Sequence, residues 1–83
     1  MARSHLKLTA RETTVLALLA GGLSMRSIAD RLGISYRTVA FHKYGMMRKA
    51  GLMTNAELLN FAFRRGIFER PTVVNWSNDE ESR

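Results

Sequence analysis

Four helix-start signals, each followed by a glycine that ends the segment, divide most of this 83-residue chain into short pieces. Two of the starts are capping boxes, formed by Thr9 with Glu12 and by Thr54 with Glu57, in which each side chain accepts from the backbone N–H of the other residue. The other two starts are serine N-caps, and glycine ends a helix at little cost because it adopts the left-handed conformation. These signals predict helices over about 10–20, 25–32, 36–50 and 55–65.

The connections between these helices are only a few residues long, and no segment shows the alternating pattern of a strand. Short connections place successive helices against one another, so the sequence predicts an all-α fold, a four-helix bundle in a single domain. We expect residues 9–66 to form this domain, with residues 1–8 as a leader and residues 67–83 as a flexible tail.

The residue content argues against several kinds of site. The chain has no cysteine, and its two histidines lie far apart without a third ligand, so we expect no metal and no cofactor. No serine has a base and an orienting acid at a recognisable spacing, which leaves an enzyme as the least expected class. The longest uncharged apolar stretch, residues 15–23, is too short to span a bilayer, and no signal segment opens the chain. We therefore expect a cytoplasmic protein that is not an enzyme and does not contact a membrane.

Positive charge is concentrated in the predicted domain. Residues 1–66 hold 11 basic and 3 acidic residues, whereas residues 67–83 hold 2 basic and 4 acidic residues. The two net charges, +8 and −2, make up the +6 of the whole chain. A small domain that is this basic favours a polyanionic partner.

The second and third predicted helices are joined by a tight link, Gly33-Ile34-Ser35, which is the layout of a helix-turn-helix. The second helix of that motif enters the major groove of DNA. A helical wheel of residues 36–50 places Val39, Met46 and Ala50 on one side, with His42 at its edge. The opposite side carries Arg37, Ala40, Phe41, Tyr44 and Arg48. Residues 35–50 include four bases and no acid, so this outward side suits phosphates, guanines and thymine methyl groups.

A longer pattern runs in register through all four predicted helices. Its parts are Leu8-Thr9-Ala10-Arg11-Glu12, Val15-Leu16, Gly22-Leu23-Ser24, Ile28-Ala29, Leu32-Gly33-Ile34-Ser35, Thr38-Val39, His42, Arg48-Lys49 and Gly51. Over about residues 6–66 this pattern resembles the LuxR-type DNA-binding domain, which is also named after NarL, FixJ and GerE. Members of that family often carry a receiver or ligand-binding domain as well. Because 83 residues leave no room for one, we expect a standalone small regulator or an excised C-terminal domain.

The resemblance implies which residues touch DNA. Base contacts would come from the two residues after the Thr-Val pair and from one a turn later, which are Ala40, Phe41 and Tyr44. Phosphate contacts would come from Arg37, Thr38, Lys43, Arg48 and Lys49, and the cap Ser35 belongs to the same expected set. The chain departs from the family at Ala40, where a long polar residue is common, and at Ser27, Gly45 and Ala50.

The fourth predicted helix is apolar over an arc of about 200°, wider than the ~100° stripe that packing on one core requires. Leu59 and Phe63 lie on the side of this helix away from Leu58 and Phe61. We therefore expect Leu59 and Phe63 to lie in a self-complementary dimer interface. The resemblance agrees, because this helix commonly carries the dimer contact in the family. In the alternative, the tail folds back over the helix.

These observations predict a sequence-specific DNA-binding transcriptional regulator. We expect it to bind double-stranded DNA at two half-sites about 10 bp apart, as a homodimer or as a heterodimer with a related regulator. A contact with RNA polymerase is a further expected interaction. Two alternatives stay open: a protein-interaction helix-turn-helix that pairs with another regulator and binds DNA weakly by itself, and the promoter-reading domain of a sigma factor.

Overall fold

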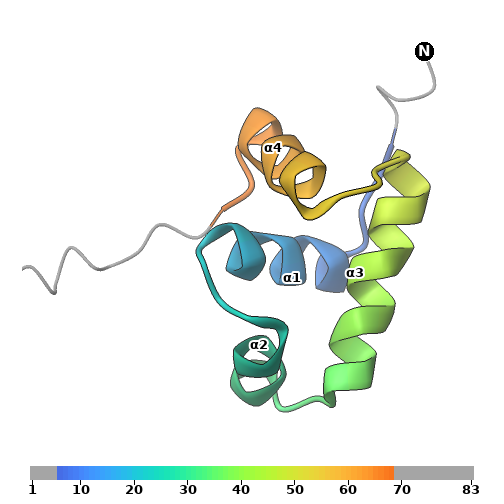
Figure 1. Ribbon diagram of the computed structural model, residues 1–83. Helices are drawn as coiled ribbons and strands as arrows, with labels where there is room; N and C mark the ends of the chain where they lie inside the picture. Colours follow the sequence, from blue (N-terminus) through green and yellow to red (C-terminus); the bar gives the residue numbers. More distant parts are fainter. Residues whose placement is uncertain (1–5, 69–83) are drawn as a thin grey trace, which may run out of the picture.

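Four α-helices make up the fold of residues 6–68, which are the residues that the computed structural model describes (Figure 1). The helices are α1 (Ala10–Ala20), α2 (Met25–Leu32), α3 (Tyr36–Ala50) and α4 (Asn55–Arg65), and the described residues include no strand. The predicted all-α, four-helix fold is therefore confirmed, with the helix bounds that the caps indicated. The leader up to residue 5 and the tail from residue 69 lie outside the described residues.

Local capping explains where these helices begin. The Thr9 hydroxyl accepts from the Glu12 N–H at 3.0 Å, and the Glu12 carboxylate accepts from the Thr9 N–H at 2.9 Å. Thr54 and Glu57 repeat this arrangement at the start of α4, at 3.1 and 3.2 Å. Each box satisfies two donors that the first turn of a helix leaves without a backbone acceptor.

Helix α1 lies in the middle of the fold, between α4 and α2, and α3 runs along one side (Figure 1). It packs against all three other helices, while α3 also packs against α2. The largest fully buried side chains come from every helix, and they are Val15, Leu16, Ile28, Val39, Met46 and Leu58. One core therefore holds α2 and α3 in a fixed relative position.

The packed unit extends slightly beyond residues 9–66. Leu8, just before α1, and Ile67, just after α4, both pack against the core. The Ile67 N–H also donates to the Ala62 carbonyl at 2.8 Å, which completes the glycine-terminated end of α4.

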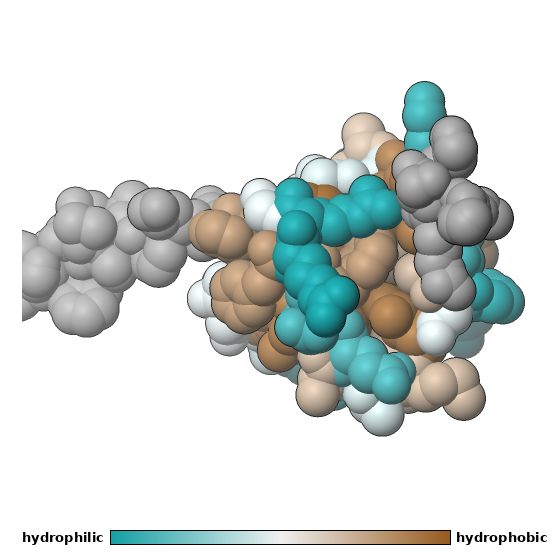
Figure 2. All heavy atoms as spheres, turned by 90° about the horizontal axis from the view of Figure 1, so that it is seen from above, coloured by the Kyte–Doolittle hydropathy of each residue, from teal (hydrophilic) through white to brown (hydrophobic). Residues whose placement is uncertain are grey.

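The surface on the α4 side mixes residue types. Viewed from above, it shows hydrophilic residues lying next to hydrophobic ones (Figure 2). No helix among residues 6–68 is long and apolar enough to cross a membrane.

Candidate nucleic-acid interface

The helix-turn-helix is formed by α2, a three-residue link and α3. Gly33 has a φ of 69°, in the left-handed region that glycine adopts without strain, and this lets the chain turn sharply after α2. Ser35 then caps α3, since its hydroxyl accepts from the Thr38 N–H at 3.0 Å and lies 2.9 Å from the Thr38 hydroxyl. The two hydroxyl residues predicted to contact DNA therefore share one hydrogen-bonded cap at the start of α3.

We define the outward face of α3 as Arg37, Ala40, Phe41, Tyr44 and Arg48. Phe41 is 71% exposed and Tyr44 is 51% exposed, although both are aromatic. Arg37 and Arg48 are also exposed, whereas Ala40 is half-buried. The structure thus brings the two predicted base-reading aromatics and two predicted phosphate ligands together on one accessible surface.

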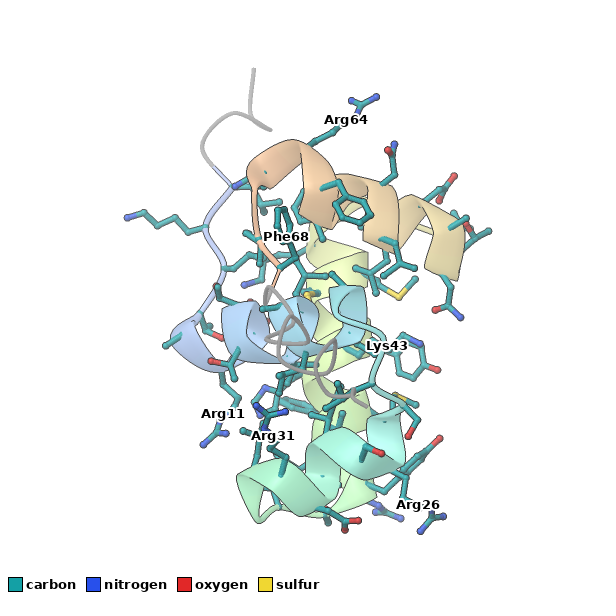
Figure 3. All side chains as sticks on the ribbon, turned by 90° about the vertical axis from the view of Figure 1, so that its left-hand side faces the viewer. Arg11, Arg26, Arg31, Lys43, Arg64 and Phe68 are labelled. Atoms are coloured by element: carbon teal, nitrogen blue, oxygen red, sulfur yellow. The ribbon has the colours of Figure 1, made fainter. Side chains whose placement is uncertain are left out.

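Two further residues, Tyr36 and Arg26, belong beside this face and were not predicted from the sequence. Tyr36 is 47% exposed, and the Arg26 guanidinium of α2 lies 5.7 Å from the centre of its ring. Arg26 extends outward from the first turn of α2 (Figure 3). Tyr36, Ala40 and Tyr44 are spaced four residues apart, so the helical period was the signal that pointed to Tyr36.

Lys49 forms an ion pair within the domain. Its ammonium lies 2.7 Å from the Glu12 carboxylate and donates to the Lys7 carbonyl at 3.2 Å. Burial by itself raises the pKa of Glu12, but hydrogen bonds from Lys49 and Thr9, together with the Lys49 charge, lower this pKa below its usual value. This ion pair links the C-terminal end of α3 to the N-terminal end of α1 and accounts for the position of Lys49.

Lys43 is buried, unlike the exposed aromatic residues and arginines of the outward face. Only 7% of its surface is exposed, and its ammonium lies 5.1 Å from the centre of the Tyr44 ring. Position 43 follows Val39 by four residues and precedes Met46 by three, so the period that buries those two side chains also turns Lys43 inward. Its charge favoured a phosphate contact, whereas its spacing in α3 places it on the buried side.

The predicted dimer residues lie on the accessible side of α4. Phe63 is 58% exposed, and Leu59 is half-buried. The Phe63 ring packs at a tilt on Phe68, with 5.5 Å between ring centres, so Phe68, three residues after the end of α4, covers part of it. The rest of the Phe63 ring is exposed apolar surface on the part of the chain that the structure describes.

No group of three or more histidine, cysteine, aspartate or glutamate side chains that would suit a metal ion is found in residues 6–68. The electrostatic character of the helix-turn-helix instead comes from cations. Acidic side chains are absent from α3, and Asp30 is the acidic residue of α2.

Comparisons with known proteins agree with the helix-turn-helix fold. Residues 6–62 match the model of the family described as bacterial regulatory proteins, luxR family. The transcriptional regulatory protein MctR of Rhizobium johnstonii is 36% identical over 63 residues, which are 76% of this chain and 29% of that protein. The oxygen regulatory protein NreC of Staphylococcus aureus is 37% identical over 62 residues, covering 75% of this chain and 29% of its own length.

A solved structure is similar as well. The LuxR-type receptor VqmA of Vibrio cholerae, a dimer described in the absence of its target DNA, aligns with a TM-score of 0.72 and 37% identity. The alignment covers 89% of this chain and 34% of the VqmA chain. This chain therefore spans about a third or less of the length of each of these relatives.

Proposed function

This chain belongs to the luxR family of bacterial regulatory proteins, and from that premise we propose that its α3 reads the major groove of DNA while α4 pairs two copies on adjacent half-sites. It carries the helix-turn-helix domain of a transcriptional regulator, since the family match includes all of α2 and α3. The match favours a luxR-type regulator over the promoter-reading domain of a sigma factor.

The observation that carries the proposal is the exposure of two aromatic rings on an acid-free helix. Phe41 and Tyr44 leave large apolar surfaces in water, which is unfavourable unless a partner covers them. Arg37 and Arg48 flank them and supply the charge that attracts phosphates. In this arrangement the arginines position the domain, and the aromatic residues contact base edges and thymine methyl groups.

Pairing through α4 is supported by Phe63 and Leu59. Two copies would present two recognition helices and double the number of DNA contacts, which supplies affinity that one small domain lacks. The similar VqmA structure is itself a dimer. A homodimer and a heterodimer with a related regulator use the same surface, and RNA polymerase is a further proposed partner of the DNA-bound form.

The experiment that tests α3 as the reading helix is DNA selection with Phe41→Ala and Tyr44→Ala. Each variant should relax the preference at the base pairs it contacts, at a cost of about 1–3 kcal/mol for each lost specific contact. Met53→Ala is the matched control, because Met53 is 81% exposed and lies outside α3. Recovery of the wild-type site with unchanged stringency by both aromatic variants would show that they are not base-reading residues.

One observation favours a second candidate function. Phe41 is the more exposed of the two aromatic residues on the outward face, and the side chain of its neighbour Ala40 offers no hydrogen-bonding group. Such a surface also suits a protein partner, and the domain would then pair with another regulator and bind DNA weakly by itself. Under this function the Phe41→Ala variant loses the protein complex and keeps its DNA affinity.

A further inference from the structure

A small pocket opens where all four helices meet, and its lining includes no residue of the outward face of α3. Its volume is about 270 Å³. Most of its wall is apolar and comes from Leu19, Leu23, Leu58 and Leu59. The role proposed above for α3 in reading DNA leaves this pocket unused.

Lys43 is the charged residue in this wall. It is more than nine-tenths buried, and within residues 6–68 its ammonium has neither a carboxylate nor a hydrogen-bond acceptor as a partner. Its contact is with the face of the Tyr44 ring, at 5.1 Å. Figure 3 shows Lys43 beside the connection between α1 and α2, the segment that supplies Leu23 to the pocket. Buried lysines are normally paired with an anion, so the pocket contains a cation that lacks its counter-charge.

Two helix N-termini add positive potential at the same place. Met25 and Asn55, which line the pocket, are the first residues of α2 and α4. N–H groups in a first turn have no acceptor within the helix, and the helix dipole makes them partly positive. The Ser24 hydroxyl accepts from the Ser27 N–H. The Met25 N–H therefore does not have this hydroxyl as its acceptor. The nearby Glu57 carboxylate does not line the pocket and is bonded to the N–H groups of Met53 and Thr54.

We propose that this pocket binds a small organic monocarboxylate, with the carboxylate against Lys43 and the hydrocarbon part against the leucines. The single buried cation matches one negative charge, and the apolar wall disfavours a fully hydrated inorganic anion. A volume of about 270 Å³ corresponds to roughly nine water volumes of ~30 Å³, which suits a ligand of about ten non-hydrogen atoms. Octanoate has this size and charge and serves as the probe.

The test is a titration of the 83-residue chain with sodium octanoate, followed by NMR chemical shifts and calorimetry in the absence of DNA. We expect saturable binding with shifts centred on Leu23, Lys43 and Leu58. Octan-1-ol has the same hydrocarbon chain without the charge, and inorganic phosphate has a charge without the hydrocarbon chain. Each should bind at least about tenfold more weakly than octanoate. Failure of octanoate to saturate, or equal binding of either comparison compound, would overturn the proposal.

Variants locate the site. Lys43→Met should weaken octanoate binding about tenfold or more, while Lys7→Met, at an exposed lysine, should leave it unchanged. Asn55→Asp is the second variant if Lys43→Met does not fold. A carboxylate is well tolerated in the first turn of α4, and it should repel the ligand and weaken binding. Equal effects of the two lysine variants, or full binding by the Asp variant, would show that octanoate binds elsewhere.

A backbone phosphate of DNA is the competing source of an anion at Lys43. In that case Lys43→Met lowers the salt dependence of DNA binding by about 0.9 in the log–log slope, as loss of a phosphate ligand does. Such a drop would overturn the monocarboxylate proposal. Because octanoate binding is measured without DNA, its failure is distinguishable from failure of the proposed DNA-binding function.

Discussion

The Lys49 ammonium and the Glu12 carboxylate lie 2.7 Å apart, although the two residues are 37 positions apart in the chain. The same carboxylate caps α1 by accepting from the Thr9 N–H. Glu12 is almost fully buried, whereas the Lys49 side chain is 37% exposed. One glutamate therefore completes a helix start and also holds the far end of α3 against it.

This double role predicts a graded loss of stability. Glu12→Gln keeps the capping geometry and removes the charge, so it should lower the free energy of unfolding by about 1 kcal/mol. Glu12→Ala removes both contacts and should cost about 2 kcal/mol. Glu57→Gln is the matched control, because Glu57 occupies the same position of a capping box in α4 and forms no ion pair with a lysine within residues 6–68. Urea unfolding measures the differences, and equal losses in the two Gln variants would contradict the role of Lys49.

The lowered pKa of Glu12 predicts acid sensitivity. Its folded-state pKa lies below that of the unfolded chain, because hydrogen bonds and the Lys49 charge outweigh the effect of burial. The stabilisation is therefore present above the unfolded value of about 4.3 and is lost as pH falls through the folded value. We expect the unfolding free energy of the wild type to fall more steeply than that of Glu12→Gln below about pH 4.5. Parallel curves from denaturant unfolding at several pH values would refute this.

Gly45 offers a stabilising substitution inside α3. A Cβ placed there would lie 3.7 Å from a Glu12 carboxylate oxygen, which is an ordinary contact distance. Because alanine favours the helix over glycine, Gly45→Ala should raise the unfolding free energy by about 1 kcal/mol. Gly33→Ala is the control of opposite sign, since Gly33 has a φ of 69° and an alanine there is strained. Thermal and urea unfolding check both signs, and destabilisation by Gly45→Ala would show that the contact with Glu12 is tighter than the structure indicates.

Arg37 and Lys49 should behave differently in DNA binding, although the family resemblance implied a phosphate contact for both. Arg37 is free to meet a phosphate on the outward face, so Arg37→Ala should reduce the log–log salt slope by about 0.9. Lys49 is paired with Glu12, so Lys49→Ala should mainly lower stability and leave the slope unchanged. Arg64→Ala, at an exposed position of α4, is the control. Binding measured at several salt concentrations decides between these outcomes, and a reduced slope for Lys49→Ala would restore its role as a phosphate ligand.

Phe63 should control pairing without controlling folding. It is 58% exposed, so Phe63→Glu should leave a helical, folded domain while abolishing cooperative binding to two half-sites. Met53→Glu, at another exposed apolar position, should keep both properties. Sedimentation measures whether each variant pairs, and circular dichroism measures whether it stays folded. A wild-type chain that stays monomeric and binds without cooperativity would exclude the α4 interface, and an unfolded Phe63→Glu variant would place Phe63 in the core.

Much of this fold was predictable because its determinants act over three or four residues. Thr54 and Glu57 mark the start of α4 through hydrogen bonds between near neighbours, and the structure has the same start. The exposure of Phe41 and Tyr44 likewise follows from helical period alone, since the opposite side of α3 supplies Val39 and Met46 to the core. Helix bounds and the outward face are thus properties of local sequence.

The partners of the lysines were decided by the tertiary structure. Local sequence carries no information about which side chain meets Lys49, because its contact with Glu12 forms only when α1 and α3 pack together. Lys43 was expected to contact phosphate, but the positions of α1, α2 and α4 enclose it and give it a pocket in place of solvent. A lysine side chain is long and flexible, so its ammonium can occupy many positions for a single position of its helix. The packing of the other helices then selects one of these ammonium positions. The charges in the sequence therefore indicated a basic domain, but they did not show which cations are available to contact DNA.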